Sequence, residues 1–215
     1  MPSSVISHQA PGLALKIKYP NKFDGTALCI STMVPDINIF FDPYLPFNFR
    51  NFTHSLVGLI VLTIPLTLFL TYIFCLKIGP FFAQVAKRKG LFSKSFTYFG
   101  LDEWDNLKKK EFNKKFFIIA TYSAFIGGLT HLLLDLPAHE NIEMFFPIII
   151  PSPDFLLYSI IDFGPVTIGQ RQIERNLTVY GVIWIIETLI TFVIALYLLR
   201  YIKKRDLISK WYNKI

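Results

Sequence analysis

Histidine is rare in this chain of 215 residues, and its placement gives the first indication of chemistry. The four histidines are His8, His54, His131 and His139. His131 and Asp135 are four residues apart, so on a helix both side chains project from one face. Pro137 is expected to end that helix, which leaves His139 in the adjoining loop. Because neutral imidazole and carboxylate groups are ligands of Zn²⁺ in proteins, this spacing predicts a metal site.

The composition argues against an ordinary soluble protein. Hydrophobic residues make up 53% of the chain and charged residues 17%, whereas a globular domain carries roughly 25% charged residues. Too few charged side chains remain to cover a surface that faces water. Cys29 and Cys75 lie in apolar stretches and share no motif, which argues against a disulfide framework and against a cysteine-based zinc site. We therefore expect an integral membrane protein.

Three apolar segments are long enough to cross a bilayer, whose hydrocarbon core takes about 20 helical residues. They are residues 55–76, 116–136 and 177–199, and Glu187 interrupts the third. Glu187 could relay protons, although a hydrogen bond within the helix bundle is the commoner role of such a residue. The sequence thus predicts an all-α fold: one polytopic helical membrane domain over residues 1–215 with three full spans.

Two further apolar regions are not expected to be clean spans. Residues 3–17 and 26–34 form two short arms around a polar turn, which predicts a short helical hairpin within residues 1–36. Residues 144–163 contain three prolines, which favours an interfacial or re-entrant segment. Residues 140–176 are accordingly predicted to form an outer or re-entrant region.

Basic residues indicate the orientation in the membrane. The predicted loop of residues 77–115 holds ten of the 22 lysines and arginines, and the tail after Leu199 holds six more. By the positive-inside rule, both segments face the cytoplasm of a multi-pass cell-membrane protein. The loop could also bind anionic lipid head groups. Nucleic acid is not an expected partner, because no recognition module accompanies the positive charge.

This topology places every histidine at the outer end of an apolar segment. The hairpin returns Asp36 to the level of His8, the first span begins at His54, and the second span ends at His131 and Asp135. We therefore predict one site for a divalent metal, with Zn²⁺ as the first choice, near the outer face. Its candidate ligands are His8, Asp36, His54, His131, Asp135 and His139. Asp36 or Asp135 could act as the general base instead of as a ligand.

Four motifs in a fixed order carry a resemblance to a known family. They are Met1-Pro2 with Ser7-His8, the segment Ser31-Thr-Met-Val-Pro-Asp36, the segment Thr53-His-Ser-Leu-Val-Gly58, and the segment Gly128-Leu-Thr-His-Leu-Leu-Leu-Asp135 with His139. The set resembles a family of uncharacterised prokaryotic integral-membrane proteins. More distantly it is similar to membrane-bound metal-dependent hydrolases and to zinc phospholipase C and P1 nuclease enzymes. The resemblance implies a metal site at the same six residues and hydrolysis of a phosphoester.

Two classes of function remain open at this point. In the first, the metal activates water for attack on a phosphoester, and the substrate is a lipid or a lipid-linked molecule that arrives from the bilayer. In the second, the protein is not a catalyst, and the polar cluster binds a structural metal, seals helix ends or conducts an ion or a proton. A closed sphere of four ligands would favour the second class, because a catalytic site keeps a position for water.

Overall fold

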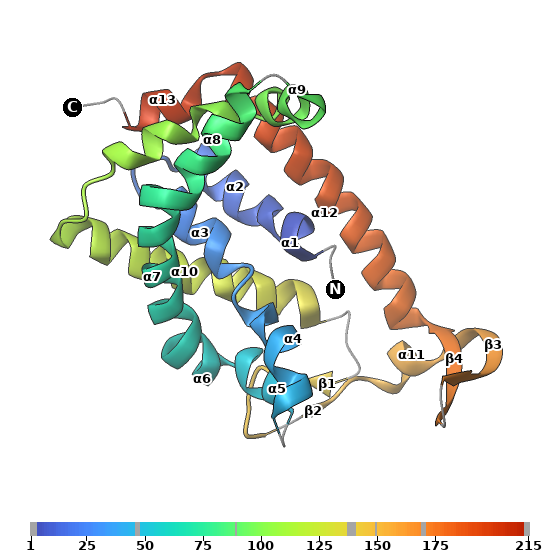
Figure 1. Cartoon of the computed structure of the whole chain (residues 1–215). Helices are drawn as coiled ribbons and strands as arrows, with labels where there is room; N and C mark the ends of the chain where they lie inside the picture. Colours follow the sequence, from blue (N-terminus) through green and yellow to red (C-terminus); the bar gives the residue numbers. More distant parts are fainter. Residues whose placement is uncertain are drawn as a thin grey trace.

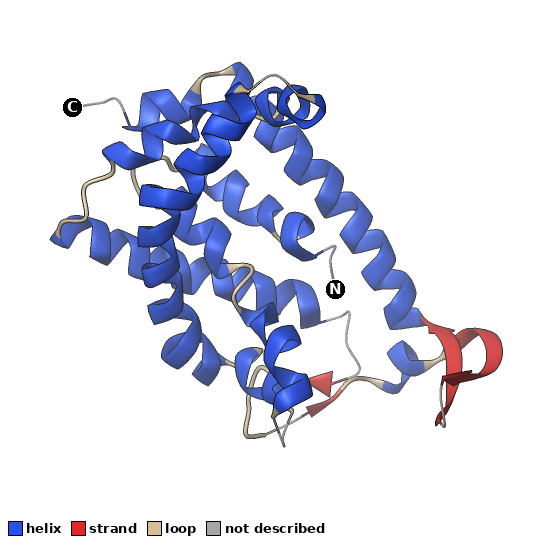
Figure 2. Ribbon diagram, viewed as in Figure 1, coloured by secondary structure: helices blue, strands red, loops and turns tan. Residues whose placement is uncertain are grey.

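The computed structural model describes residues 4–45, 48–88, 90–136, 141–148, 150–168 and 171–212. Helices dominate this part of the chain, and two small two-stranded sheets lie at one end of the molecule (Figures 1 and 2). The mainly helical fold predicted from the sequence is confirmed, and the sheets are an addition to it.

Three helices among the described residues are long and apolar enough to cross a membrane: Leu56–Lys87, Lys114–Asp135 and Val179–Lys204. The second is α10 and the third is α12. They correspond to the three predicted spans, and the first one continues for eleven residues beyond residue 76, to Lys87. Membrane character is therefore supported by both the composition and the helix lengths.

The first of these helices is continuous although it contains two prolines. It consists of α6 (Leu56–Gly58), η3 (Leu59–Thr63), α7 (Ile64–Ile73), η4 (Phe74–Ile78) and α8 (Gly79–Lys87). Pro65 and Pro80 each follow a wide π-helical turn, η3 or η4. Such a turn accommodates a proline, which has no backbone N–H to donate, so the prolines do not end the helix.

The N-terminal region forms the expected pair of short helical arms. The first arm is α1 (Ser4–Ser7) with α2 (Gln9–Lys18), and the second is α3 (Gly25–Ser31). Asp24 caps α3 by accepting a hydrogen bond from the backbone N–H of Ala27. Short helical turns follow, namely η1 (Pro35–Ile37), α4 (Asn38–Phe41), η2 (Asp42–Tyr44) and α5 (Phe49–Thr53).

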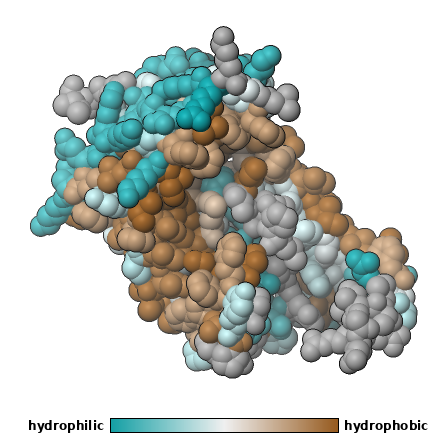
Figure 3. Space-filling view, viewed as in Figure 1, coloured by the Kyte–Doolittle hydropathy of each residue, from teal (hydrophilic) through white to brown (hydrophobic). Residues whose placement is uncertain are grey.

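The basic segment of residues 77–115 is largely helical and not an open loop. After α8 it contains α9 (Leu91–Tyr98) and η5 (Leu101–Lys109), and the short helix α13 (Leu207–Tyr212) packs against η5. Gly100 joins α9 to η5 with a φ of 86°, a conformation that favours glycine. These elements form the hydrophilic end of the molecule, and apolar side chains cover the helices below them (Figure 3).

The region expected to be interfacial or re-entrant contains extended strands. β1 (Asn141–Ile142) pairs with β2 (Ile150–Pro151), and β3 (Ser159–Ile168) pairs with β4 (Arg171–Thr178), both antiparallel. The helix α11 (Asp154–Leu157) lies between the two pairs in the chain. Three prolines within residues 147–153 disfavour a long helix here, and β-branched residues in β3 favour strand pairing.

Close contact between helices depends on two adjacent glycines of α10. A Cβ atom on Gly127 would lie 2.1 Å from Ser31 Oγ, and one on Gly128 would lie 2.2 Å from Leu59 Cδ1. Any larger residue would therefore push α10 away from α3 and from the first spanning helix. This packing fixes the C-terminal half of α10 against α3 and the start of the first spanning helix.

Candidate metal centre

Four side chains from three separate segments meet at the C-terminal end of α10. Asp36 is held in the short turn η1, which begins with Pro35. His54 follows α5 directly, and His131 and Asp135 lie one turn apart on α10. One ligand atom from each residue lies within 4.8 Å of the others, so the group could hold a metal ion. The convergence predicted from the spans is confirmed for these four residues.

The individual distances describe a compact arrangement. Nε2 of His54 lies 3.3 Å from Oδ2 of Asp135 and 3.6 Å from Oδ1 of Asp36. Nε2 of His131 lies 3.4 Å from the same Asp135 oxygen and 3.7 Å from the same Asp36 oxygen. The two Nε2 atoms are 3.4 Å apart. His131 is completely buried and His54 is 5% exposed, so water competes little for these atoms.

Backbone and hydroxyl partners assign the proton on each imidazole to the nitrogen that faces away from the cluster. Nδ1 of His131 lies 2.7 Å from the carbonyl oxygen of Thr32, which can only accept a hydrogen bond. Nδ1 of His54 lies 3.0 Å from Oγ1 of Thr53, whose own proton goes to the carbonyl of Arg50. Both Nδ1 atoms are therefore donors, and both Nε2 atoms present a lone pair to the cluster.

The donor set fits a cation. Two imidazole lone pairs and two carboxylates face one another at short distances, so they repel one another. A proton or a metal cation between them removes this repulsion. The same field acts on His54: burial disfavours its charged form, but the Asp135 and Asp36 carboxylates raise the pKa of the imidazole above its usual value. The site therefore favours positive charge.

The motif Thr53-His54-Ser55 is explained by local structure. Thr53 orients the imidazole, and Ser55 caps the first spanning helix by accepting a hydrogen bond from the backbone N–H of Gly58. A Cβ atom on Gly58 would lie 1.9 Å from the carbonyl oxygen of Phe52, so this position requires glycine. The motif thus combines a candidate ligand, the residue that orients it and the turn that positions both.

The remaining two candidate ligands have different outcomes. His8 lies beside the cluster, with Nε2 3.4 Å from the second oxygen of Asp135 and its ring 4.5 Å from the ring of His131. It therefore contacts a ligand from outside the group of four, and its buried Nδ1 has no hydrogen-bond partner within the described chain. His139 lies outside the described residues.

A small cavity adjoins the cluster. Two of the residues that line it, Arg50 and Glu143, were not predicted from the sequence. Its lining includes His54 and Asp135 together with Arg50 and Glu143, and its volume of about 20 Å³ is enough for one water molecule. Nε of Arg50 donates to Oε2 of Glu143 at 3.1 Å. Arg50 is four residues before His54, a spacing that could have suggested a shared face. Glu143 is 93 residues away from Arg50, so only the fold could bring it there.

The comparisons with known proteins identify a family and no activity. A family described as a domain of unknown function, DUF4184, matches residues 1–210, so the chain belongs to that family. No curated protein and no solved structure matches the chain.

Proposed function

Since family membership carries no activity, we propose from the chemistry of the site that the protein is a membrane-bound, metal-dependent hydrolase of phosphoesters. Asp36, His54, His131 and Asp135 would hold the metal. Two imidazole nitrogens and two carboxylate oxygens suit Zn²⁺. When bound, such a metal supplies hydroxide near neutral pH by lowering the pKa of a coordinated water. The single observation that carries the proposal is the meeting of these four donors beside a cavity of one water volume.

Arg50 supports a substrate that carries phosphate. Its hydrogen bond to Glu143 uses Nε, and within the described chain the terminal amino groups form no further hydrogen bond. A guanidinium group matches the geometry of phosphate oxygens, and this one lines the cavity beside His54. The role of Arg50 is thus to orient the phosphoester next to the metal ligands, while Glu143 holds the guanidinium in place.

The position of the cluster supports a lipid or lipid-linked substrate. His54 immediately precedes the first spanning helix, and Asp135 is the last residue of α10. Both lie at helix ends, where the bilayer meets water. A phosphoester head group at that depth can reach the edge of the cavity, which itself has room for one water molecule, while its acyl chains stay in the membrane. One of the two aspartates would accept the proton of the attacking water, since a base must lie within hydrogen-bond reach.

The proposed orientation places the basic end in the cytoplasm and the cluster near the outer face. Cysteines introduced at the exposed residues Asp154 and Lys108, with Cys29 and Cys75 replaced by serine, test it. In intact cells, an impermeant thiol reagent should modify D154C, and it should modify K108C only after the membrane is permeabilised. Modification of both positions in intact cells would overturn the orientation.

Metal analysis of the purified protein tests the site itself. The variant D36N/D135N should lose bound metal and phosphodiesterase activity, whereas the control D154N/D162N removes two exposed carboxylates and should keep both. Normal metal content in D36N/D135N would eliminate the site. Normal metal content in the wild-type protein without hydrolysis of any phosphoester would favour the non-catalytic alternative, in which four ligands close the coordination sphere of a structural metal.

A further inference from the structure

A second cavity lies at the opposite, hydrophilic end of the molecule, between the C-terminal end of α8 and the helix α9. Its volume is about 550 Å³, within the range of small-molecule binding sites. Its lining residues include Lys87, Arg88, Ser93, Lys94 and Asp102. The cavity is therefore predominantly basic, and it is separate from the His/Asp cluster.

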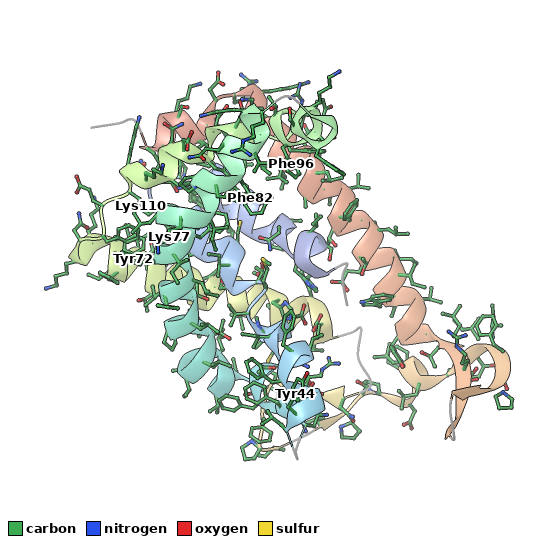
Figure 4. The ribbon with its side chains drawn as sticks, viewed as in Figure 1. Tyr44, Tyr72, Lys77, Phe82, Phe96 and Lys110 are labelled. Carbon is green, nitrogen blue, oxygen red and sulfur yellow. The ribbon has the colours of Figure 1, made fainter. Side chains whose placement is uncertain are left out.

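A hydrogen bond and a contact between aromatic rings connect α8 and α9, which form the walls of this cavity. Oγ1 of Thr97 on α9 donates to the carbonyl oxygen of Ala86 on α8 at 3.0 Å. Behind them Phe82 packs edge-on against Phe96, with ring centroids 6.4 Å apart (Figure 4). Arg200 of α12 donates to the carbonyl oxygen of Tyr98 at 2.8 Å and stacks on its ring. The position of α9 is thus fixed from two sides.

The charges of the lining leave two cations for a ligand. Lys87 forms an ion pair with Asp105, and Asp102 accepts a hydrogen bond from Lys203 at 2.8 Å. Arg88 and Lys94 are exposed and form no salt bridge with any described residue. The cavity thus offers two cationic groups to a ligand.

Apolar side chains next to the cavity indicate where the rest of the ligand lies. Phe92 on α9 is 71% exposed, and Phe81, which lies in α8 near the end of the first spanning helix, is 60% exposed. Exposed aromatic residues beside basic residues are typical of the bilayer interface. A ligand with an anionic head and an apolar body satisfies both parts of this surface.

We propose that this cavity binds the head group of an anionic phospholipid from the leaflet on the basic side of the membrane. Arg88 and Lys94 contact the phosphate. The acyl chains lie against Phe92 and Phe81. This site does not depend on the activity proposed for the metal centre.

Native mass spectrometry of the full chain in detergent, titrated with phosphatidylglycerol or phosphatidylcholine, tests the proposal. Phosphatidylglycerol should bind at least about tenfold more tightly than phosphatidylcholine. R88Q/K94Q should bind phosphatidylglycerol about 30-fold more weakly than the wild-type protein does, because each of the two basic residues contributes about 1 kcal/mol and 1.4 kcal/mol is a factor of ten. The control K108Q/K115Q removes the same charge from exposed positions outside the cavity and should change the affinity by less than about twofold.

Three results would overturn the assignment. Equal weakening in R88Q/K94Q and K108Q/K115Q would mean diffuse attraction and no defined site. Equal binding of phosphatidylcholine would exclude recognition of the anionic head group. Inorganic phosphate or glycerol phosphate that binds as tightly as phosphatidylglycerol would identify a soluble phosphate ligand in place of a lipid. Both double variants replace exposed side chains, and an unchanged melting temperature verifies that they are folded.

Discussion

Two buried polar clusters lie at opposite ends of α3, and they differ in whether their charges balance. At the N-terminal end, Lys110 Nζ lies 2.8 Å from Asp24 Oδ2 and donates to Thr26 Oγ1 at 3.1 Å. At the C-terminal end, the carbonyl of Thr32 orients His131 in the His/Asp cluster. The helix α10 runs beside both, since Ser123 accepts a hydrogen bond from the backbone N–H of Asp24.

The first cluster contains its own counter-charge. Burial disfavours the charged form of each partner, but Asp24 raises the pKa of Lys110 and Lys110 lowers the pKa of Asp24, so both stay ionised. The second cluster has two imidazoles and two carboxylates at its centre without a lysine or arginine among them, so a proton or a bound cation would balance it. Buried charged residues that pair with each other therefore do not indicate a ligand site. Buried hydrogen-bond acceptors that face one another without a donor do indicate one.

The largest difference between the clusters should appear when the metal ligands are removed. We expect H54A/H131A to lose bound metal completely, and a chelator to lower the melting temperature of the wild-type protein but not of this variant. At a metal concentration of 1,000 times Kd, binding stabilises a protein by about 4 kcal/mol. Thermal unfolding with and without chelator provides the measurement. An equal response of both proteins to the chelator would contradict the assignment.

Variants of the Asp24–Lys110 ion pair should lose stability but keep bound metal. D24N and K110M should each reduce the free energy of unfolding by about 3–5 kcal/mol, because each leaves one buried charge without its partner. The double variant D24N/K110M should recover most of that loss, and all three proteins should keep their metal. Denaturant unfolding and metal content are the two readouts. Additive losses in the double variant would show that the two residues do not act as a pair.

A smaller effect is expected where the metal centre meets its cavity. R50Q should keep its metal and lower kcat/KM for a phosphodiester substrate by about 100-fold, in line with the loss of a charge-assisted contact of about 2–3 kcal/mol. R50K should restore part of the activity, since lysine supplies the charge without the bidentate geometry. If R50Q hydrolyses the substrate at the wild-type rate, Arg50 has no role in binding phosphate.

The smallest effect concerns Lys16, which lies close to the ion pair. Burial lowers the pKa of Lys16 from 10.5 to about 8, with a smaller opposing effect of Asp24. Between pH 8 and 10.5 the unfolded chain therefore binds more protons at Lys16 than the folded protein does. The stability of the wild-type protein relative to K16M should rise by about 2 kcal/mol across that interval. A difference that is independent of pH would contradict this.

Features with a local cause could be predicted from the sequence. The helical period placed His131 and Asp135 on one face, and the length of the apolar runs located the three spanning helices. The alternation of these runs along the chain predicted that Asp36 and His54 would reach the same place. The continuation of the first helix through Pro80 was missed, because a proline in a sequence does not show whether a wide turn precedes it.

Only the tertiary structure decided the features that join distant segments. The pairing of Lys110 with Asp24 and of Arg50 with Glu143 links residues 86 and 93 positions apart, and no periodicity relates them. The sequence by itself determined which residues could bind a metal and that they lie at helix ends. The packing of α10, allowed by its glycines, decided which of the described candidates meet, because distances between helices depend on side-chain volume along the whole interface.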